Sequence, residues 1–298
     1  MKRKYPQVKK QWLSKPMEKK ILAFVYFILR FSVVGVLIAQ ISNRDFESAF
    51  LCVLTLILFL APNFIERRLH IDVPDTLEII ILLFIYSAEI LGEIRAYYIT
   101  FPYWDTMLHT INGFLCAAIG FSLVDILNRN TKITTFSLSS AYMAFVAFCF
   151  SMTVGVLWEF FEAAIDHFLL LDMQKDTIVN TIGSVMLAPD GSNHPQVIKD
   201  IADVIIVHSD GTQQALGLGG YLDIGLLDTM KDLFVNFIGA VVFSIIGYFY
   251  VKQRGSGRFA RRFIPKLMTQ APEDAGTPSP EEAGQPVREE AGTKAGDP

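Results

Sequence analysis

Residues 138–164 read LSSAYMAFVAFCFSMTVGVLWEFFEAA, a stretch in which apolar side chains dominate and the only charged residues are Glu159 and Glu162. A run this long and apolar exceeds the roughly 20 residues that an α-helix needs to cross the hydrocarbon core of a bilayer. Burying one charged side chain there costs about 2.5 kcal/mol or more, so an intramembrane acid indicates a functional position. The stretch therefore predicts a membrane-spanning helix that carries chemistry near its end.

Five further apolar segments extend this prediction along the chain. The 298 residues are 52% hydrophobic and 19% charged, with a mean hydropathy of +0.38, which places the chain in the membrane class. We expect an all-α polytopic membrane protein, a six-helix transmembrane bundle within residues 21–251. The predicted spans are residues 21–41, 49–65, 77–98, 106–126, 138–164 and 233–251. The cysteines within them show no metal-ligand spacing and are expected to be reduced packing residues.

The distribution of lysine and arginine predicts the orientation of the bundle. Residues 1–20 hold eight of them and residues 252–266 hold six, whereas the long loop at 168–227 holds only Lys175 and Lys199. Because basic flanks stay on the cytoplasmic side, we expect both termini inside a bacterial cytoplasmic membrane. The predicted parts are a basic cytoplasmic segment (1–20), the bundle (21–251), a basic juxtamembrane segment (252–270) and a disordered, acidic cytoplasmic tail (271–298).

Under this topology, the intramembrane ionisable residues sort to one side of the membrane. The third and fifth spans end on the outer side, and the fourth and sixth begin there, so their acids meet at one level. The set consists of Glu89, Glu93, Asp105, His109, Glu159, Glu162, Asp166, Asp228, Asp232 and the neighbouring Asn236. We expect these side chains to face one cavity near the outer interface.

Helical spacing adds a chemical pattern to this set. Asp105 and His109 are four residues apart and share a helix face, and Asp228, Asp232 and Asn236 repeat that spacing. Carboxylates packed together require bound protons or a compensating cation. One histidine among several carboxylates suits Mg²⁺, Mn²⁺, Zn²⁺ or iron better than a soft metal. If a metal rather than bound protons neutralises the cluster, the pattern suits hydrolytic chemistry, in which the cation polarises a phosphoryl or carbonyl group and a carboxylate or His109 moves the proton.

Roles follow for the individual residues. The expected metal ligands are His109, Glu159, Glu162 and Asp232. Asp105 and Asp228 complete the predicted catalytic set by orienting these ligands. Asn236 is expected to bind substrate or to support the ligands, as are the more peripheral Glu89, Glu93 and Asp166.

Structural explanations compete for several of these residues. Asp105 and Asp228 could cap their helices. Glu93 could form an interfacial ion pair, and His109 could be a satisfied packing histidine. Glu159 is the hardest to explain in this way, because it lies in an otherwise apolar helix.

The outer loop at 168–227 carries two local patterns. Alternating β-branched residues at 197–207, a turn signal at 209–212 and a return at 213–216 predict a β-hairpin insertion. Residues 176–183 (DTIVNTIG) echo residues 232–239 (DLFVNFIG), which indicates either a short re-entrant helix beside the sixth span or a chance similarity. A connection of this length is more often a lid or binding element than a plain linker.

Three motifs carry a family resemblance: Trp104-Asp-Thr-Met-Leu-His109, Trp158-Glu-Phe-Phe-Glu162 and Gly225-Leu-Leu-Asp-Thr-Met-Lys-Asp-Leu-Phe-Val-Asn-Phe-Ile-Gly239. Over residues 77–251 they resemble the YjdF-like bacterial membrane proteins, which implies an integral membrane protein and brings no established activity. A more distant similarity to VanZ-like membrane proteins rests on the aspartate, histidine, glutamate, asparagine and glycine of these motifs. The glutamine that follows the VanZ-like glutamate is not clearly present here, and the long loop departs from that pattern. The antibiotic-resistance role of a VanZ member is thus only a loose hint of cell-envelope chemistry.

Three functions are compatible with these patterns. The leading hypothesis is a membrane-embedded, metal-dependent enzyme that acts at the outer leaflet on a lipid-linked or cell-envelope substrate, with membrane lipid as a partner. A proton-coupled transporter is the alternative, because clustered acids also form proton relays, although inner-half acids are sparse and no inverted repeat is evident. A membrane scaffold or assembly protein is the third. The sequence contains no nucleotide-binding loop, and nothing in it supports nucleic-acid binding.

Overall fold

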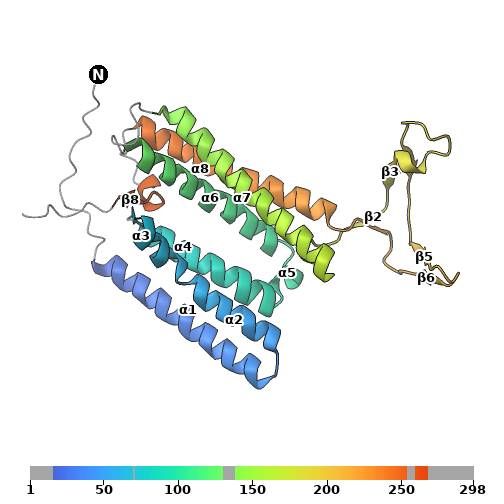
Figure 1. Cartoon of the computed structure of the whole chain (residues 1–298), viewed down its shortest axis with the longest axis horizontal. Helices are drawn as coiled ribbons and strands as arrows, with labels where there is room; N and C mark the ends of the chain where they lie inside the picture. The colour runs from blue at the N-terminus through green and yellow to red at the C-terminus, as the bar shows by residue number, and fades with distance from the viewer. Residues whose placement is uncertain (1–15, 70, 130–137, 254–258, 268–298) are drawn as a thin grey trace, which may run out of the picture. The chain divides into compact units, whose positions relative to one another are not determined.

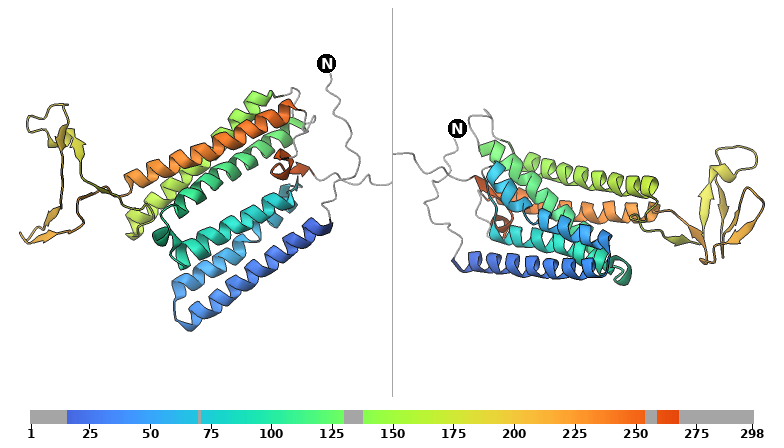
Figure 2. Two further views of the ribbon diagram at one scale, coloured as in Figure 1. Left: turned by 180° about the vertical axis from the view of Figure 1, so that it is seen from behind. Right: turned by 60° about the horizontal axis from the view of Figure 1, so that its bottom comes forward.

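The computed structural model of the chain describes residues 16–69, 71–129, 138–253 and 259–267 (Figure 1). Its principal helices are α1 (Pro16–Ser42), α2 (Phe46–Leu58), α3 (Ala61–Leu69), α4 (Asp75–Tyr86), α6 (Trp104–Arg129), α7 (Ser140–Leu169) and α8 (Leu226–Lys252). α6, α7 and α8 pack side by side, as both views in Figure 2 show, and α1 packs on α2 and α4. The chain is an all-α polytopic membrane protein. The predicted tail at 271–298 and most of the basic segment at 1–20 lie outside the described residues.

Five helices within the described ranges are long and apolar enough to cross a membrane: Lys19–Ser42, Phe46–Arg68, Trp104–Asn128, Ser140–Leu169 and Leu226–Lys252. The second of these is interrupted between α2 and α3. Pro62 explains the break, because a proline has no N–H to donate to the carbonyl four residues earlier and its ring crowds that carbonyl.

The segment expected to form the third span, 77–98, is divided between several elements. α4 continues directly into a π-helix, η1 (Ser87–Ile94), and the chain then turns at Ala96 (φ 56°) into the single-turn α5 (Tyr97–Thr100). A Cβ atom on Gly92 would collide with the ring of Tyr98, so α5 folds back tightly on the π-helix. This segment therefore presents a short helix, a π-helix and a tight return instead of one uniform helix.

Glycines set the separation between α6 and α8. A Cβ atom on Gly113 would collide with the backbone carbonyl of Asn236, and one on Gly239 would collide with the carbonyl of Thr110. Small residues of this kind let two membrane helices approach until their backbones touch. From this crossing toward the end of α8, fully buried aromatic residues such as Phe121 and Phe243 fill the core.

Residues 259–267 return to this core. After η3 (Ala260–Arg262), the side chains of Phe263 and Ile264 are buried, and the ring of Phe263 meets that of Phe114 edge-on with 5.0 Å between centroids. β8 (Lys266–Leu267) then pairs antiparallel with β1 (Ile71–Asp72), which precedes α4. The segment thus packs against α4, α6 and α8 at the end of the bundle where α4 begins.

The connection between α7 and α8 is built from short strands. These are β2 (Ile178–Val179), β3 (Ile182–Ser184), β4 (Gln196–Ile198), β5 (Ile205–Val207), β6 (Gln213–Ala215) and β7 (Tyr221–Leu222), with the 3-10 turn η2 (Val185–Leu187). β2 pairs with β7, β3 with β4, and β5 with β6, all antiparallel. The β2–β7 pair brings the two ends of the insertion together next to the bundle.

The re-entrant helix considered for residues 176–183 is wrong, because the structure has β2 and β3 there. Its β-branched residues favour extended backbone, and the amide of Asn180 donates to the carbonyls of Ile201 (2.7 Å) and Gly219 (2.9 Å), which anchors this extended form. The stretch of alternating β-branched residues at 197–207 does not form one strand but contributes to two, β4 and β5. The left-handed backbone of Asp200 (φ 54°) lies between these two strands.

Candidate functional site

Three helix ends bring the predicted residues together. Asp105 and His109 lie in the first two turns of α6, Glu159 and Glu162 lie in about the last three turns of α7, and Asp232 lies in the second turn of α8. Since α6 and α8 begin at the same end at which α7 finishes, and all three helices pack together, these side chains meet at one level of the bundle.

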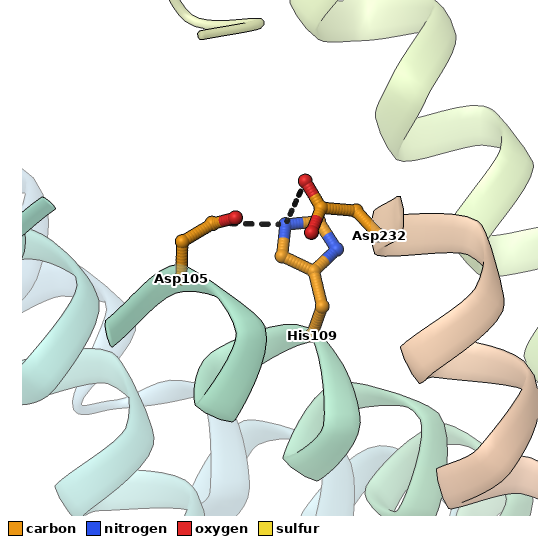
Figure 3. A group of neighbouring side chains, drawn as sticks. All are labelled: Asp105, His109 and Asp232. Atoms are coloured by element: carbon orange, nitrogen blue, oxygen red, sulfur yellow. Dashed lines mark ion pairs between the residues drawn. The ribbon is translucent and has the colours of Figure 1, made fainter. Parts of the chain in front are cut away.

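His109 is the centre of the cluster (Figure 3). Its Nε2 atom lies 3.4 Å from Asp105 Oδ1 and 4.0 Å from Asp232 Oδ2, and its Nδ1 atom lies 3.8 Å from Glu159 Oε1. His109, Glu159 and Asp232 are buried, whereas Asp105 is partly open. Both ring nitrogens therefore face carboxylates that come from three different helices.

Lys231, which the sequence analysis missed, faces the same acids. Its Nζ atom lies 2.5 Å from Asp228 Oδ1, 3.4 Å from Asp105 Oδ2 and 3.6 Å from Asp232 Oδ1. Its side chain is 43% exposed, so the ammonium group sits at the open edge of the cluster. The signal was present in the sequence, because Lys231 follows Asp228 by three residues and directly precedes Asp232.

The glutamates of α7 are held in two different ways. The indole N–H of Trp158 donates to Glu162 Oε1 at 2.8 Å. Glu159 has no such donor to its second oxygen, Oε2, which is buried without a hydrogen-bond partner among the described residues. Asp232 Oδ1 and Asp105 Oδ2 likewise accept no hydrogen bond among the described residues, although the Lys231 ammonium lies within ion-pair distance of both. A buried acceptor left unpaired is costly, so these oxygens mark a place where a ligand would be stabilised.

Among the described residues, two groups of side chains could hold a metal ion. One is Asp105, His109 and Asp232, and the other is His109, Glu159 and Glu162; within each, the ligand atoms lie within 4.8 Å of one another. The four metal ligands expected from the sequence are therefore divided between the two groups, which share His109. Asp105, which was expected only to orient the ligands, belongs to the first group.

Asn236 forms the inner wall of the cluster. Its Oδ1 accepts a hydrogen bond from Asn112 Nδ2 at 3.3 Å, and its Nδ2 points at Met152 Sδ at 3.7 Å. A Cβ atom on Gly155 of α7 would collide with the Asn236 amide group. Asn236 therefore joins α6, α7 and α8 one turn beyond Asp232, in the direction of the apolar core.

Asp228 and Asp166 bind the start of the insertion. Asp228 Oδ2 accepts from the backbone N–H of Lys175 at 2.9 Å, and Asp166 accepts from the N–H groups of Met173 (2.6 Å) and Gln174 (2.8 Å). The side chain of Gln174 donates to Thr229 Oγ1 at 2.6 Å. The N-cap of α8 is Gly225, so Asp228 is not the N-cap of that helix. These contacts hold the start of the insertion against the end of α7 and the start of α8, beside the His109 cluster.

The residues at the two ends of the insertion are acidic. Outside the membrane-spanning helices, burial raises the pKa of Asp176, and the nearby carboxylates of Asp172, Asp223 and Asp166 add to the effect. Like charges in proximity disfavour ionisation of each member, and together they attract cations.

Glu89 and Glu93 lie beside the cluster rather than within it. Both belong to η1, and the phenol of Tyr98 lies within electrostatic reach of both and also of Asp105 and Glu162. In the described ranges, neither glutamate joins the ion pairs around His109. Tyr98 is a second residue that the sequence analysis missed, and its position in a short return helix gave no periodic signal.

A buried acid also lies at the opposite end of the bundle. Glu78, near the start of α4, accepts a hydrogen bond from the Tyr26 hydroxyl at 2.6 Å and is 5% exposed. The sequence analysis treated inner-half acids as sparse and left Glu78 out.

A comparison with protein families now gives the class of protein. Residues 23–193 match the family described as predicted membrane protein (DUF2238), and because the match covers more than half of the chain, the chain belongs to this family. It is an integral membrane protein of unknown function, and the match does not show the more specific YjdF-like or VanZ-like resemblance. Searches of curated proteins and of solved structures found no match. The matched residues include Asp105, His109, Glu159 and Glu162, whereas Lys231 and Asp232 lie beyond them.

Proposed function

We propose that this chain is a membrane-embedded, metal-dependent enzyme that acts on a lipid-linked or cell-envelope substrate at the outer leaflet. The observation that carries the proposal is the pair of buried carboxylate oxygens Asp105 Oδ2 and Asp232 Oδ1, which accept no hydrogen bond among the described residues and belong to the two carboxylates that face Nε2 of His109. A divalent cation would coordinate these oxygens, which lie 3.4 and 3.6 Å from the partly exposed Lys231 ammonium.

The first group, Asp105, His109 and Asp232, is the better cation site. Both carboxylates face Nε2 of the imidazole, which is then the coordinating nitrogen. Glu159 faces Nδ1 and would hold the proton there, the arrangement by which carboxylates usually orient metal-binding histidines. Imidazole with two carboxylates suits Zn²⁺, Mn²⁺ or Mg²⁺. Three protein ligands would leave coordination positions for water and substrate, as in catalytic metal sites.

Such a site supports hydrolysis. A bound cation polarises a phosphoryl or carbonyl oxygen and makes coordinated water more acidic. Glu162, held by Trp158, is a carboxyl group beside the site and would move a proton. Asn236 would contact substrate or support the ligands. Membrane lipid reaches this level directly, because Phe160 and Phe161 on the same turns of α7 are exposed.

The topology that we propose has six spans, with α4 and η1 together forming the third. The N-terminus and the basic segment after α8 would lie in the cytoplasm of a bacterial cell, with the acidic tail beyond them. The β-hairpin insertion at 168–227 would then lie outside, beside the cation site. Residues 75–94 form an uninterrupted helical stretch, which supports counting α4 and η1 as one span.

A proton-coupled carrier is the second candidate. It is favoured by the carboxylates on both nitrogens of His109, which are compatible with a proton relay, and by the buried Glu78 at the other end. The apolar core between Asn236 and Glu78, which includes Phe121 and Phe243, makes it the weaker of the two. A scaffold role has no specific contact in its favour.

Metal content of the purified protein tests the proposal. The parent, incubated with Mn²⁺, Zn²⁺ or Mg²⁺ and then desalted, should retain about one equivalent by mass spectrometry. Asp232→Asn and His109→Gln should retain none. Glu78→Gln is the matched control, because it neutralises a buried carboxyl at the other end of the bundle. If the parent retains no metal under any of these conditions, the cation site is refuted and the proton-relay function takes its place.

A further inference from the structure

A second polar site, separate from the His109 cluster, lies in a groove between α1 and α3. The groove has a volume of about 560 Å³ and is lined mainly by Tyr26, Phe27, Arg30, Phe31 and Val34 of α1 and by Asn63 of α3. Phe27 and Phe31 are 66% and 72% exposed, so in a bilayer the groove opens to lipid. It contains one full positive charge, on Arg30, within an otherwise apolar wall.

Arg30 is unusual because it lies in the middle of a membrane-spanning helix, Lys19–Ser42. In the part of the chain that the structure describes, no ion pair joins it to a carboxylate. Its guanidinium group instead lies over the Tyr26 ring, 4.7 Å from the centroid. The nearby carboxylate of Glu78 already accepts the Tyr26 hydroxyl at 2.6 Å, and Asn63 donates to that hydroxyl at 3.3 Å. An intramembrane arginine costs several kcal/mol unless a partner compensates it.

We propose that this groove binds an anionic phospholipid from the leaflet in which α1 begins. Lys20, Ala23, Phe27, Arg30 and Val34 are spaced by alternating three and four residues, so they form one stripe along α1. Lys20 is exposed at the end of this stripe. The Arg30 guanidinium, turned back over Tyr26, lies six residues or about 9 Å along the helix from the level of Lys20.

A phosphate group fits between these two cations. Each long side chain can bend toward it, and a guanidinium binds phosphate oxygens through two parallel N–H bonds. One acyl chain would then lie against Phe27 and Phe31 and extend toward Val34 and the bilayer centre. Arg67 and Arg68 at the end of α3 add positive charge at the same end and favour an anionic headgroup over a zwitterionic one. This site is independent of the proposed cation site.

Lipid retention in nanodiscs tests the proposal. The full chain is reconstituted in phosphatidylcholine alone or mixed with phosphatidylglycerol, and the lipid retained after release from the disc is measured by native mass spectrometry. The parent should retain one phosphatidylglycerol in preference to phosphatidylcholine. Arg30→Gln should weaken this preference at least about fivefold, which corresponds to the loss of one basic contact near the membrane surface. Arg44→Gln, in the turn after α1, is the control and should change nothing.

Each other outcome overturns the proposal. Equal retention of phosphatidylglycerol by the parent and Arg30→Gln would show that Arg30 does not bind the headgroup. An equal loss in Arg44→Gln would show non-specific attraction to basic residues. Lys20→Gln is a second variant, at an exposed position that does not affect folding of the helix interior. It should weaken retention as well, and an unchanged value for it would exclude the two-cation clamp even if Arg30→Gln fails to fold.

Discussion

Replacing Lys231 by glutamine should tighten divalent-cation binding at the His109 cluster. The Lys231 ammonium lies 3.4 Å from Asp105 Oδ2 and 3.6 Å from Asp232 Oδ1, and these two carboxylates are also ligands of the proposed cation site. A metal ion must therefore compete with an internal cation for both. Glutamine keeps a similar length and removes the charge, so the competition disappears.

The size of the effect follows from the exposure of the lysine. Because the Lys231 side chain is 43% exposed, each contact counts as a partly solvated ion pair worth about 0.2–1 kcal/mol. Breaking two of them costs about 0.4–2 kcal/mol. The Kd for the metal should therefore fall between about twofold and thirtyfold in Lys231→Gln.

Mn²⁺ is a convenient probe, because free and bound ions are distinguished by electron paramagnetic resonance of the detergent-solubilised protein. Lys199→Gln is the control: its side chain is exposed on the insertion between β4 and β5, and among the described residues no ion pair joins it to the cluster, so its Kd should equal that of the parent. An unchanged or weaker affinity in Lys231→Gln, with Mn²⁺ bound normally by the parent, would refute the competition. Absence of binding in the parent would refute the cation site itself.

Three further predictions concern the framework of the site. Gly239→Ala should lower the free energy of unfolding by about 1–3 kcal/mol, because the added methyl group forces α6 and α8 apart. Gly35→Ala, with open space around the added methyl group, is the control and should be neutral or slightly stabilising. Equal melting temperatures for the two variants would contradict this prediction. Hydrogen bonds from Ser48 lower the pKa of Asp45, the N-cap of α2, so its stabilisation is present above the ordinary aspartate pKa and is lost as the pH falls through the lowered value. In thermal unfolding across this pH range, Asp45→Asn should lack that part of the dependence, and an identical profile would exclude the cap. Asp166→Ala should speed amide hydrogen exchange at the start of the insertion, since it removes an acceptor for two backbone N–H groups; unchanged exchange would show that other contacts hold this segment.

Much of the site was predictable from the sequence because helices convert spacing into geometry. The interval of four residues between Asp105 and His109 gives a contact of 3.4 Å within one helix. The expected alternation of consecutive spans placed these helix ends at one level, and in the structure the packing of α6, α7 and α8 brings Glu159 and Asp232 to His109. Apolar length alone identified the long helices, including the five that the structure shows as long enough to span.

Other features depend on contacts that spacing does not encode. Lys231 was not recognised because it precedes the span predicted at 233–251, and only the packing of α6 on α8 places its ammonium among three acids. The π-helix has no periodic signature, so η1 was expected as ordinary helix. The similarity of residues 176–183 to the start of α8 was misleading as a sign of helix. These residues are extended because β2 and β3 pair with strands that are distant in the sequence.

The insertion between α7 and α8 also sets the order of events during biosynthesis. At about 5–20 residues per second, residues 170–225 take roughly 3 to 11 seconds to synthesise. During that interval α6 and α7 are complete, but α8 with its aspartates and lysine does not yet exist. The late helix therefore supplies the last members of the buried ionic cluster, after the two helices that hold Asp105, His109 and the glutamates have been synthesised.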